Sequence, residues 1–160
     1  KLGIAGPGGP DPLLAPAKQH IIVGDLTALP AISALLESFD AATRAEVLIA
    51  GSDLAIPLAP PKNVTVRWFK HTNELLDALD CMTQKMTLSD PDLEDTDPAD
   101  IPPLSGFVAG ENRLVLEARD LLRKRFSLTK ECLYAIPYWR NGQDEETYHQ
   151  ERHDIMDQKY

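Results

Sequence analysis

The sequence predicts an α/β fold of three layers, in which helices cover both faces of a five-stranded parallel sheet. Short apolar runs without polar alternation recur along the chain, a pattern typical of strands that are buried on both faces. Longer segments between them carry apolar residues at helical spacing. Such alternation of strands and helices favours right-handed βαβ crossovers and a parallel sheet. The length of 160 residues suits a single domain.

The strands are predicted from apolar runs that contain β-branched residues, which prefer extended backbone. The first, 20–24, reads His-Ile-Ile-Val-Gly. It follows four prolines and three glycines within 6–16, which predict a linker or a series of turns. The other predicted strands are 45–50, 63–69, 105–110 and 132–136. Three prolines between 51 and 62 exclude a regular crossover helix there.

The first predicted helix follows the first strand. Its apolar positions at helical spacing are Leu29, Ile32, Leu35, Leu36 and Phe39. Thr27 or Asp25 is the expected N-cap, because short polar side chains accept hydrogen bonds from the first turn. Pro30 fits that turn, where its missing N–H needs no partner.

Two more helices are predicted, over about 73–86 and from Glu111 to Phe126. Glu111 opens the latter and three basic residues at 123–125 close it, as the helix dipole favours. The acidic stretch 89–103, with four prolines, predicts an exposed, mobile loop. A further polar helix is predicted over 144–157.

The charge balance narrows the function classes. The chain has 16 basic and 25 acidic residues, a net charge of −9, which argues against nucleic-acid binding and against a polybasic membrane anchor. No apolar run approaches the roughly 20 residues of a membrane span. The two cysteines form no disulfide framework, and isolated thiols suit a reducing compartment. We therefore expect a cytoplasmic protein with no nucleic-acid or membrane partner.

A strand order of 3-2-1-4-5 would place the strands 20–24 and 105–110 side by side, where the winding direction reverses. Ligands of such sheets bind beyond the carboxyl ends of the strands at that point. Three unusual segments follow strands at this edge: Gly24–Pro30, Gly110–Glu111 and Tyr138–Arg140. We expect them to converge on one crevice.

Each segment has two interpretations. The turn at Gly24–Pro30 offers backbone N–H groups and the Thr27 hydroxyl to a phosphate, or it is an ordinary capped helix start. Glu111 faces a nicotinamide amide, or it stabilises a helix N-terminus. Tyr138 and Trp139 stack on a planar cofactor while Arg140 pairs with an anion, or they form an aromatic plug beside a solvated arginine. The familiar Gly-x-Gly-x-x-Gly dinucleotide fingerprint is absent.

His149 and His153 are spaced i, i+4, as in some metal sites. Acidic residues surround them, and an ion-paired surface helix is the favoured interpretation. We assign no metal site and no catalytic side chain.

Several motifs resemble the siderophore-interacting proteins, which are flavin-dependent ferric-siderophore reductases. Gly24–Ile32 reads GDLTALPAI and resembles the family signature G-D-E-T-A-L-P-A-I. The resemblance extends over roughly residues 2 to 146, through the motifs Ala5–Gly9, Thr43–Val47, Val108–Glu111 and Tyr138–Gly142. The sequence departs from the family pattern at Leu26, where an acid is usual, and in the acidic insertion 89–103.

The resemblance implies a sheet of order 3-2-1-4-5 in the NAD(P)H-binding domain of a two-domain reductase whose N-terminal β-barrel binds FAD. The implied organisation is the end of the barrel and a linker at 1–18, the NAD(P)H-binding domain at 19–142 and a polar extension at 143–160. The family's flavin motif, Arg-x-Tyr-Ser/Thr, does not occur in this chain, so FAD is expected to bind upstream.

The resemblance also implies cofactor-binding residues. These are Gly24, Asp25, Thr27, Ala28, Leu29 and Pro30 in the nucleotide turn, Gly110 and Glu111 near the nicotinamide, and Tyr138, Trp139 and Arg140 near the flavin. Ser52 suits the 2′-phosphate of NADPH and Asp53 suits the ribose hydroxyl of NADH, so the nucleotide preference stays open.

The implied activity is hydride transfer from NAD(P)H to FAD, followed by reduction of a ferric siderophore and release of iron. Isolated from the barrel, this chain is expected to be inactive. The alternative is a non-enzymatic module that binds a nucleotide or a protein partner.

Overall fold

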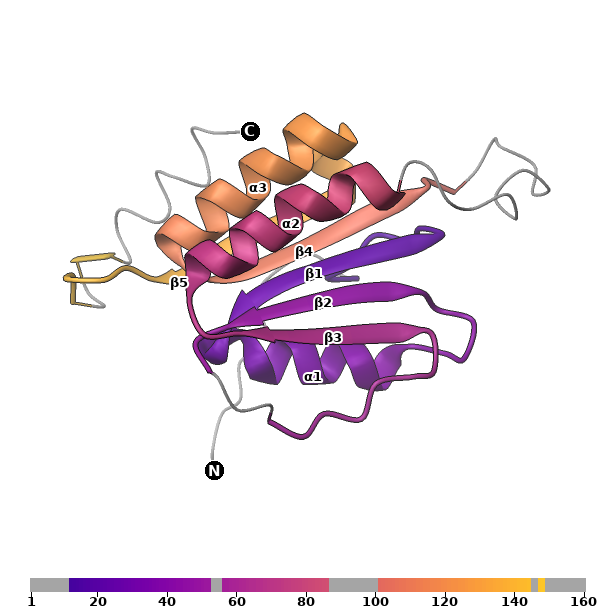
Figure 1. The fold of residues 1–160 in the computed structure, drawn as a ribbon, viewed down its shortest axis with the longest axis horizontal. Coiled ribbons are helices and arrows are strands. Elements are labelled where there is room, and N and C mark those ends of the chain that lie inside the picture. The colour runs from indigo at the N-terminus through magenta and orange to yellow at the C-terminus, as the bar shows by residue number, and fades with distance from the viewer. Residues whose placement is uncertain (1–11, 53–55, 87–100, 145–146, 149–160) are drawn as a thin grey trace, which may run out of the picture.

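A five-stranded parallel sheet in the order β3-β2-β1-β4-β5 forms the centre of the computed structural model, which describes residues 12–52, 56–86, 101–144 and 147–148. Helix α1 covers one face, and α2 and α3 cover the other (Figure 1). The strands are β1 (Gln19–Asp25), β2 (Ala45–Ala50), β3 (Val64–Phe69), β4 (Leu104–Glu111) and β5 (Leu133–Trp139). The helices are η1 (Leu26–Ala28), α1 (Leu29–Ser38), α2 (Thr72–Met86), α3 (Asn112–Phe126) and η3 (Lys130–Cys132). The predicted fold class and strand order are confirmed.

Three strands reach further toward their carboxyl ends than predicted. β1 continues to Asp25, β4 to Glu111 and β5 to Trp139, whereas the sequence predicted an end at residues 24, 110 and 136. The prediction that β5 ends at residue 136 was wrong. β5 is an edge strand, so one side of its backbone forms no hydrogen bonds with another strand, and a proline such as Pro137 can be accommodated there. The extensions carry Asp25, Glu111 and Trp139 to the same edge of the sheet.

The start and end of α1 also differ from the prediction. Asp25 caps the short helix η1, accepting a hydrogen bond from the Thr27 N–H, and Ala28 precedes α1 without a side-chain cap. Thr27 is therefore not an N-cap. Phe39 lies beyond the helix in extended backbone, and its ring stacks on His20 with centroids 5.5 Å apart.

Two apolar layers, one on each face of the sheet, form the core. Ile32 and Phe107 are fully buried on the α1 side, and Leu79 and Leu122 are fully buried beneath α2 and α3. Each such side chain contributes roughly 1.5–3 kcal/mol through removal of apolar surface from water. The described part of the chain thus has a hydrophobic core of its own.

Residues on both sides of the predicted domain 19–142 pack against the folded core. Leu14 is buried in the α1-side core. Tyr148 is 2% exposed, and its hydroxyl donates to Asn112 Oδ1 at the start of α3 (3.1 Å). The predictions for 6–11, 89–100 and the segment beyond Tyr148 lie outside the described residues, as do Asp53, His149 and His153. Within the described ranges, no helix has the length and hydropathy that a membrane span requires.

The buried His20 predicts a loss of stability in mild acid. Its Nδ1 lies 2.8 Å from Ser105 Oγ, and burial lowers the pKa of His20 below its ordinary value of 6.5. The folded protein therefore favours the neutral ring, while the unfolded chain still binds a proton near pH 6.5. The free energy of unfolding should decline as the pH falls from about 7 through the unfolded pKa toward the lower folded pKa.

Urea unfolding of the wild type and of His20→Asn between pH 7.5 and 5 measures this effect. The wild type should lose more stability over that interval than the variant does. His71→Gln, which changes an exposed histidine, serves as the control and should keep the wild-type slope. Identical pH dependence in all three proteins would contradict the assignment to His20.

Candidate functional site

The carboxylate of Asp25 binds residues of three segments at the carboxyl ends of the strands: the turn after β1 and the ends of β4 and β5. Its Oδ1 accepts hydrogen bonds from the backbone N–H of Thr27 (2.8 Å) and from the Thr27 hydroxyl. Its Oδ2 accepts from the Glu111 N–H (2.7 Å) and from the Trp139 indole Nε1–H (3.0 Å). The expected convergence of the three segments at one edge of the sheet is confirmed.

Glu111 completes the corner between β4 and α3. Its Oε2 accepts from the N–H groups of Arg113 (2.7 Å) and Leu114 (3.2 Å), so it caps α3. Its Oε1 lies 3.4 Å from the Asn141 N–H, which ties the segment after β5 to the same carboxylate. The interpretation of Glu111 as a helix-stabilising group is confirmed, and its contact with a nicotinamide stays a prediction.

Several residues of the predicted nucleotide turn have structural contacts of their own. A Cβ at Gly24 would lie 2.8 Å from Ala28 Cβ, so Gly24 allows α1 to approach β1 closely. Ala28 is buried, Leu29 is half-buried and Pro30 is exposed. Both donors of Thr27 are directed to Asp25 in this conformation rather than outward. Nucleotide contacts of this turn stay predictions.

The aromatic residues at the end of β5 differ in exposure. Tyr138 is half-buried and packs on the α1 side, and burial, with a smaller contribution from the Asp25 charge, raises the pKa of its hydroxyl. Trp139 is 41% exposed although its indole N–H is bound to Asp25, so part of its ring is open to solvent. Arg140 is half-buried, and its pairing with an anionic ligand stays a prediction.

A hollow of about 380 Å³ lies at this edge of the sheet. Three of the predicted residues line it: Asp25, Glu111 and Trp139. The remaining wall comes from the ends of β2 and β3, from the starts of α2 and α3 and from the segment after β5. Its residues are Ala50, Gly51, Lys70, His71, Thr72, Arg113 and Asn141. The hollow therefore extends across the edge from the β3 side to the β5 side.

Lys70, His71 and Arg113 were missed by the sequence analysis. The signal for Lys70 and His71 was available, because they directly follow a predicted strand and the carboxyl ends of parallel strands share one edge. Backbone bonds from the Gly51 and Ser52 N–H groups to Phe69 O (3.0 and 3.3 Å) hold the ends of β2 and β3 together. Lys70 thereby lies in the same wall as the turn after β2.

Arg113 links the starts of the two helices beside the hollow. Its Nη2 donates to Asn73 Oδ1 of α2 (3.0 Å), and its Nε pairs with Glu117 one turn further along α3 (2.7 Å). The guanidinium is thus oriented by two partners at the rim. Its position depends on how α2 and α3 pack, which spacing along the sequence does not reveal.

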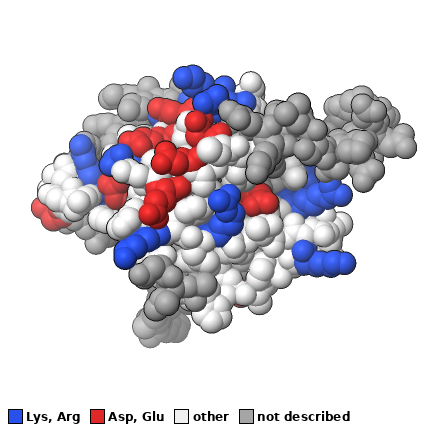
Figure 2. Space-filling view, in the orientation of Figure 1, with Lys and Arg blue, Asp and Glu red and all other residues white. Residues whose placement is uncertain are grey.

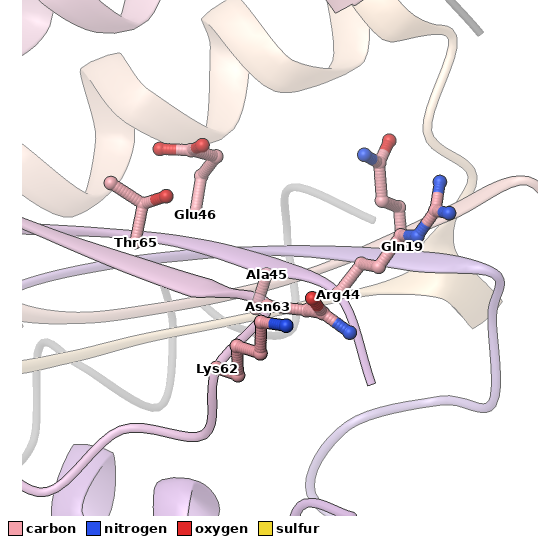
Figure 3. Close-up of a pocket in the computed structure, with 7 residues that line it drawn as sticks. All are labelled: Gln19, Arg44, Ala45, Glu46, Lys62, Asn63 and Thr65. Atoms are coloured by element: carbon pink, nitrogen blue, oxygen red, sulfur yellow. The ribbon is translucent and has the colours of Figure 1, made fainter. Parts of the chain in front are cut away.

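A second hollow, of about 290 Å³, lies at the opposite edge of the sheet (Figure 3). Arg44 and Glu46 from β2 and the preceding loop line it, with Lys62, Asn63 and Thr65 from β3 and its approach. Glu46 and Thr65 stand on one face of the sheet, whereas Lys62 and Asn63 lie on the other (Figure 3). Because these groups do not converge, we assign no site there.

Acidic side chains gather over α2 and α3 on the face seen in Figure 2, with basic residues among them. Arg125 of α3 pairs with Asp80 of α2 (2.8 Å). Exposed pairs of this kind contribute only about 0–1 kcal/mol. Among the residues that the structure describes, no cluster of His, Cys, Asp and Glu suits a metal ion.

An open parallel sheet with a polar hollow at the carboxyl ends of its strands defines the doubly wound α/β class of ligand-binding domains. The sequence matches the family model described as "Siderophore-interacting protein" over residues 17–142. The chain belongs to the siderophore-interacting protein family, as its motifs predicted.

Individual relatives agree with this assignment. The chain is 37% identical to the ferric vibriobactin reductase ViuB of Vibrio cholerae over 163 aligned positions, which cover 100% of this chain and 57% of ViuB. An uncharacterised protein of Mycobacterium tuberculosis, Rv2895c, is 44% identical over 70 residues, 41% of this chain and 24% of that protein. The chain therefore spans little more than half the length of ViuB.

Solved structures show the same fold. The siderophore-interacting protein SipS from Aeromonas hydrophila superposes with a TM-score of 0.70 at 35% identity, over 93% of this chain and 56% of SipS. The siderophore-interacting protein from Acinetobacter baumannii superposes with a TM-score of 0.63 at 19% identity, over 88% of this chain and 53% of that one, and supports the fold alone.

Proposed function

We propose that this chain is the NAD(P)H-binding domain of a flavin-dependent ferric-siderophore reductase. The observation that carries the proposal is the hollow at the carboxyl edge, where Asp25, Glu111 and Trp139 meet in a member of the siderophore-interacting family. NAD(P)H would bind there with its nicotinamide toward Glu111 and Trp139. Its hydride would pass to FAD held by a domain upstream of this chain.

The residues around the hollow suit the two chemical parts of NAD(P)H. Lys70 and Arg113 provide positive charge for phosphate groups, which prefer cationic partners with several donors. The exposed part of the Trp139 ring offers a flat apolar surface to an aromatic ring. The adenosine half would then lie toward β2 and β3, where Gly51 and Ser52 follow β2.

The flavin is required because NAD(P)H gives up two electrons as hydride whereas Fe(III) accepts one. When bound, FAD supplies that conversion. Reduction to the softer Fe(II) weakens the hold of the hard oxygen donors of a siderophore and releases the iron. The name of ViuB, a ferric vibriobactin reductase, supports reduction of a ferric siderophore as the activity.

Titration of this chain with NADPH and with NADH tests the proposal directly. We expect saturable binding of at least one nucleotide, measured by calorimetry or by intrinsic tryptophan fluorescence. Lys70→Ala should weaken that binding by about tenfold, since it removes one charge-assisted contact to phosphate. Lys62→Ala removes a lysine at the opposite edge and should bind as the wild type does.

Absence of binding by the wild type at millimolar nucleotide would overturn the proposal. The alternative, a non-enzymatic nucleotide- or partner-binding module, is separated by a second measurement. A longer native chain that includes the upstream segment should bind FAD, and NADPH or NADH should bleach its flavin absorbance. A chain that binds nucleotide but never reduces a flavin would favour the module.

A further inference from the structure

We propose that Asp25 is a positioning residue. Its carboxylate fixes the orientation of the Trp139 indole and of the backbone at Glu111, where β4 meets α3, at the edge of the hollow. The orientation of these two groups, and through them the affinity for nucleotide, would depend on this carboxylate. The part that concerns affinity rests on the proposed nucleotide-binding function.

The two carboxylate oxygens of Asp25 bind different partners, and this difference supports the positioning role. Oδ1 binds only two positions away, at the N–H and hydroxyl of Thr27. Oδ2 binds Glu111 N and Trp139 Nε1, which are 86 and 114 positions away along the chain. The first oxygen shapes the local turn, and the second connects β1 to the ends of β4 and β5.

The site is built for a carboxylate. Asp25 is 8% exposed, and a buried carboxylate is tolerated only where donors compensate for its lost hydration. Gly110 leaves space for the Asp25 carboxylate, because a Cβ at residue 110 would lie 2.6 Å from Asp25 Cγ. An asparagine would present one acceptor and one donor, so its N–H₂ would face one of the donor pairs.

Trp139 is the group whose orientation depends most directly on this contact. Its side chain is 41% exposed, so packing alone constrains the ring less than it would in a core. The Nε1–H bond to Asp25 fixes one edge of the indole. Because Trp139 lines the hollow, this bond holds its ring at the rim.

Asp40 provides a matched control. In the exposed loop between α1 and β2, its Oδ1 accepts from the Ala42 N–H (3.0 Å), the Thr43 N–H (2.7 Å) and the Thr43 hydroxyl (2.6 Å). These partners lie within three positions of Asp40, so it forms the same kind of local turn away from the hollow. Asp40→Asn disturbs such a turn without touching Trp139 or Glu111.

The first test is nuclear magnetic resonance of the indole N–H groups in this chain, which has two tryptophans, Trp68 and Trp139. In Asp25→Asn we expect the Trp139 indole resonance to move toward the value of a solvated indole. Its hydrogen exchange should become at least about tenfold faster, because a charge-assisted bond is lost. In Asp40→Asn the Trp139 resonance should stay unchanged. An unchanged Trp139 resonance in folded Asp25→Asn would overturn the proposal.

The second test is a double-mutant cycle on nucleotide affinity. Asp25→Asn and Trp139→Phe should each weaken NADPH binding by about tenfold, and the double variant should bind no more weakly than the weaker single variant. A merely structural Asp25 would lower the melting temperature and leave the two effects additive, which would overturn the proposal. If the wild type binds neither NADPH nor NADH, the proposed function fails, while the indole resonance still decides whether Asp25 positions Trp139.

Should Asp25→Asn fail to fold, Trp139→Phe replaces it. This variant removes one of the two donors on Oδ2 and leaves an aromatic ring in place. We then expect the amide resonance of Glu111, the other donor, to shift, while that of Thr43 at the Asp40 turn stays in place. An unshifted Glu111 amide would contradict the shared role of Oδ2.

Discussion

Gly110→Ala is expected to destabilise the protein by about 3–5 kcal/mol, because it combines backbone strain with a steric conflict at a buried carboxylate. Gly110 has φ +133°, a conformation that residues with a side chain rarely adopt. The added Cβ would lie 2.6–2.8 Å from the carboxylate carbon and oxygens of Asp25. Asp25 would have to withdraw, leaving the part-buried donors of Glu111 and Trp139 without their acceptor. Urea unfolding measures the loss.

Gly142→Ala is the matched control for this prediction. Gly142 also has a positive φ, +81°, but a Cβ there meets nothing within 4 Å. The substitution therefore carries the backbone strain alone and should cost about 1–2 kcal/mol. Equal losses of unfolding free energy in the two variants would show that the steric conflict with Asp25 does not contribute. That result would contradict the close packing of Gly110 against the Asp25 carboxylate.

Phe107→Ala is expected to cost about 3–5 kcal/mol, the range for truncating a fully buried aromatic side chain. Phe107 has no exposed surface, and its ring lies 6.1 Å from that of Tyr134 in the layer between the sheet and α1. The chain has an apolar core on each face of the sheet, so we expect a cooperative unfolding transition without any upstream domain. The variant should shift that transition to lower urea with a similar slope.

Two further variants keep this prediction testable if Phe107→Ala does not fold. Phe107→Leu retains most of the volume and should cost about 1.5 kcal/mol or less. Phe126→Ala truncates a half-buried ring at the end of α3 and should cost less than Phe107→Ala. A wild-type chain without a cooperative transition would mean that the described core does not fold on its own.

The local pattern of apolar residues in the sequence was sufficient to predict the architecture. Uninterrupted runs such as Ile21–Val23 and Val47–Ile49 predict strands buried on both faces, and the helical spacing of Leu75 and Leu79 predicts the layer above them. Motifs such as GDLTALPAI predicted the family. These features are readable because they depend on short contiguous segments and on the 3.6-residue period of the helix.

The partners of each polar group were decided only by the tertiary structure. The resemblance placed Asp25 in the nucleotide turn, and its nucleotide contact stays a prediction. That its carboxylate accepts from Thr27, Glu111 and Trp139 is visible only in the folded structure. Lys70 and Arg113 join the hollow through the pairing of β2 with β3 and the packing of α2 against α3. Such contacts join residues tens of positions apart, and a hydrogen bond depends on ångström-scale placement that periodicity does not encode. The sequence by itself therefore determined the sheet, its helices and the edge where three unusual segments meet. The folded arrangement decided which side chains line the hollow at that edge and which hold the edge together.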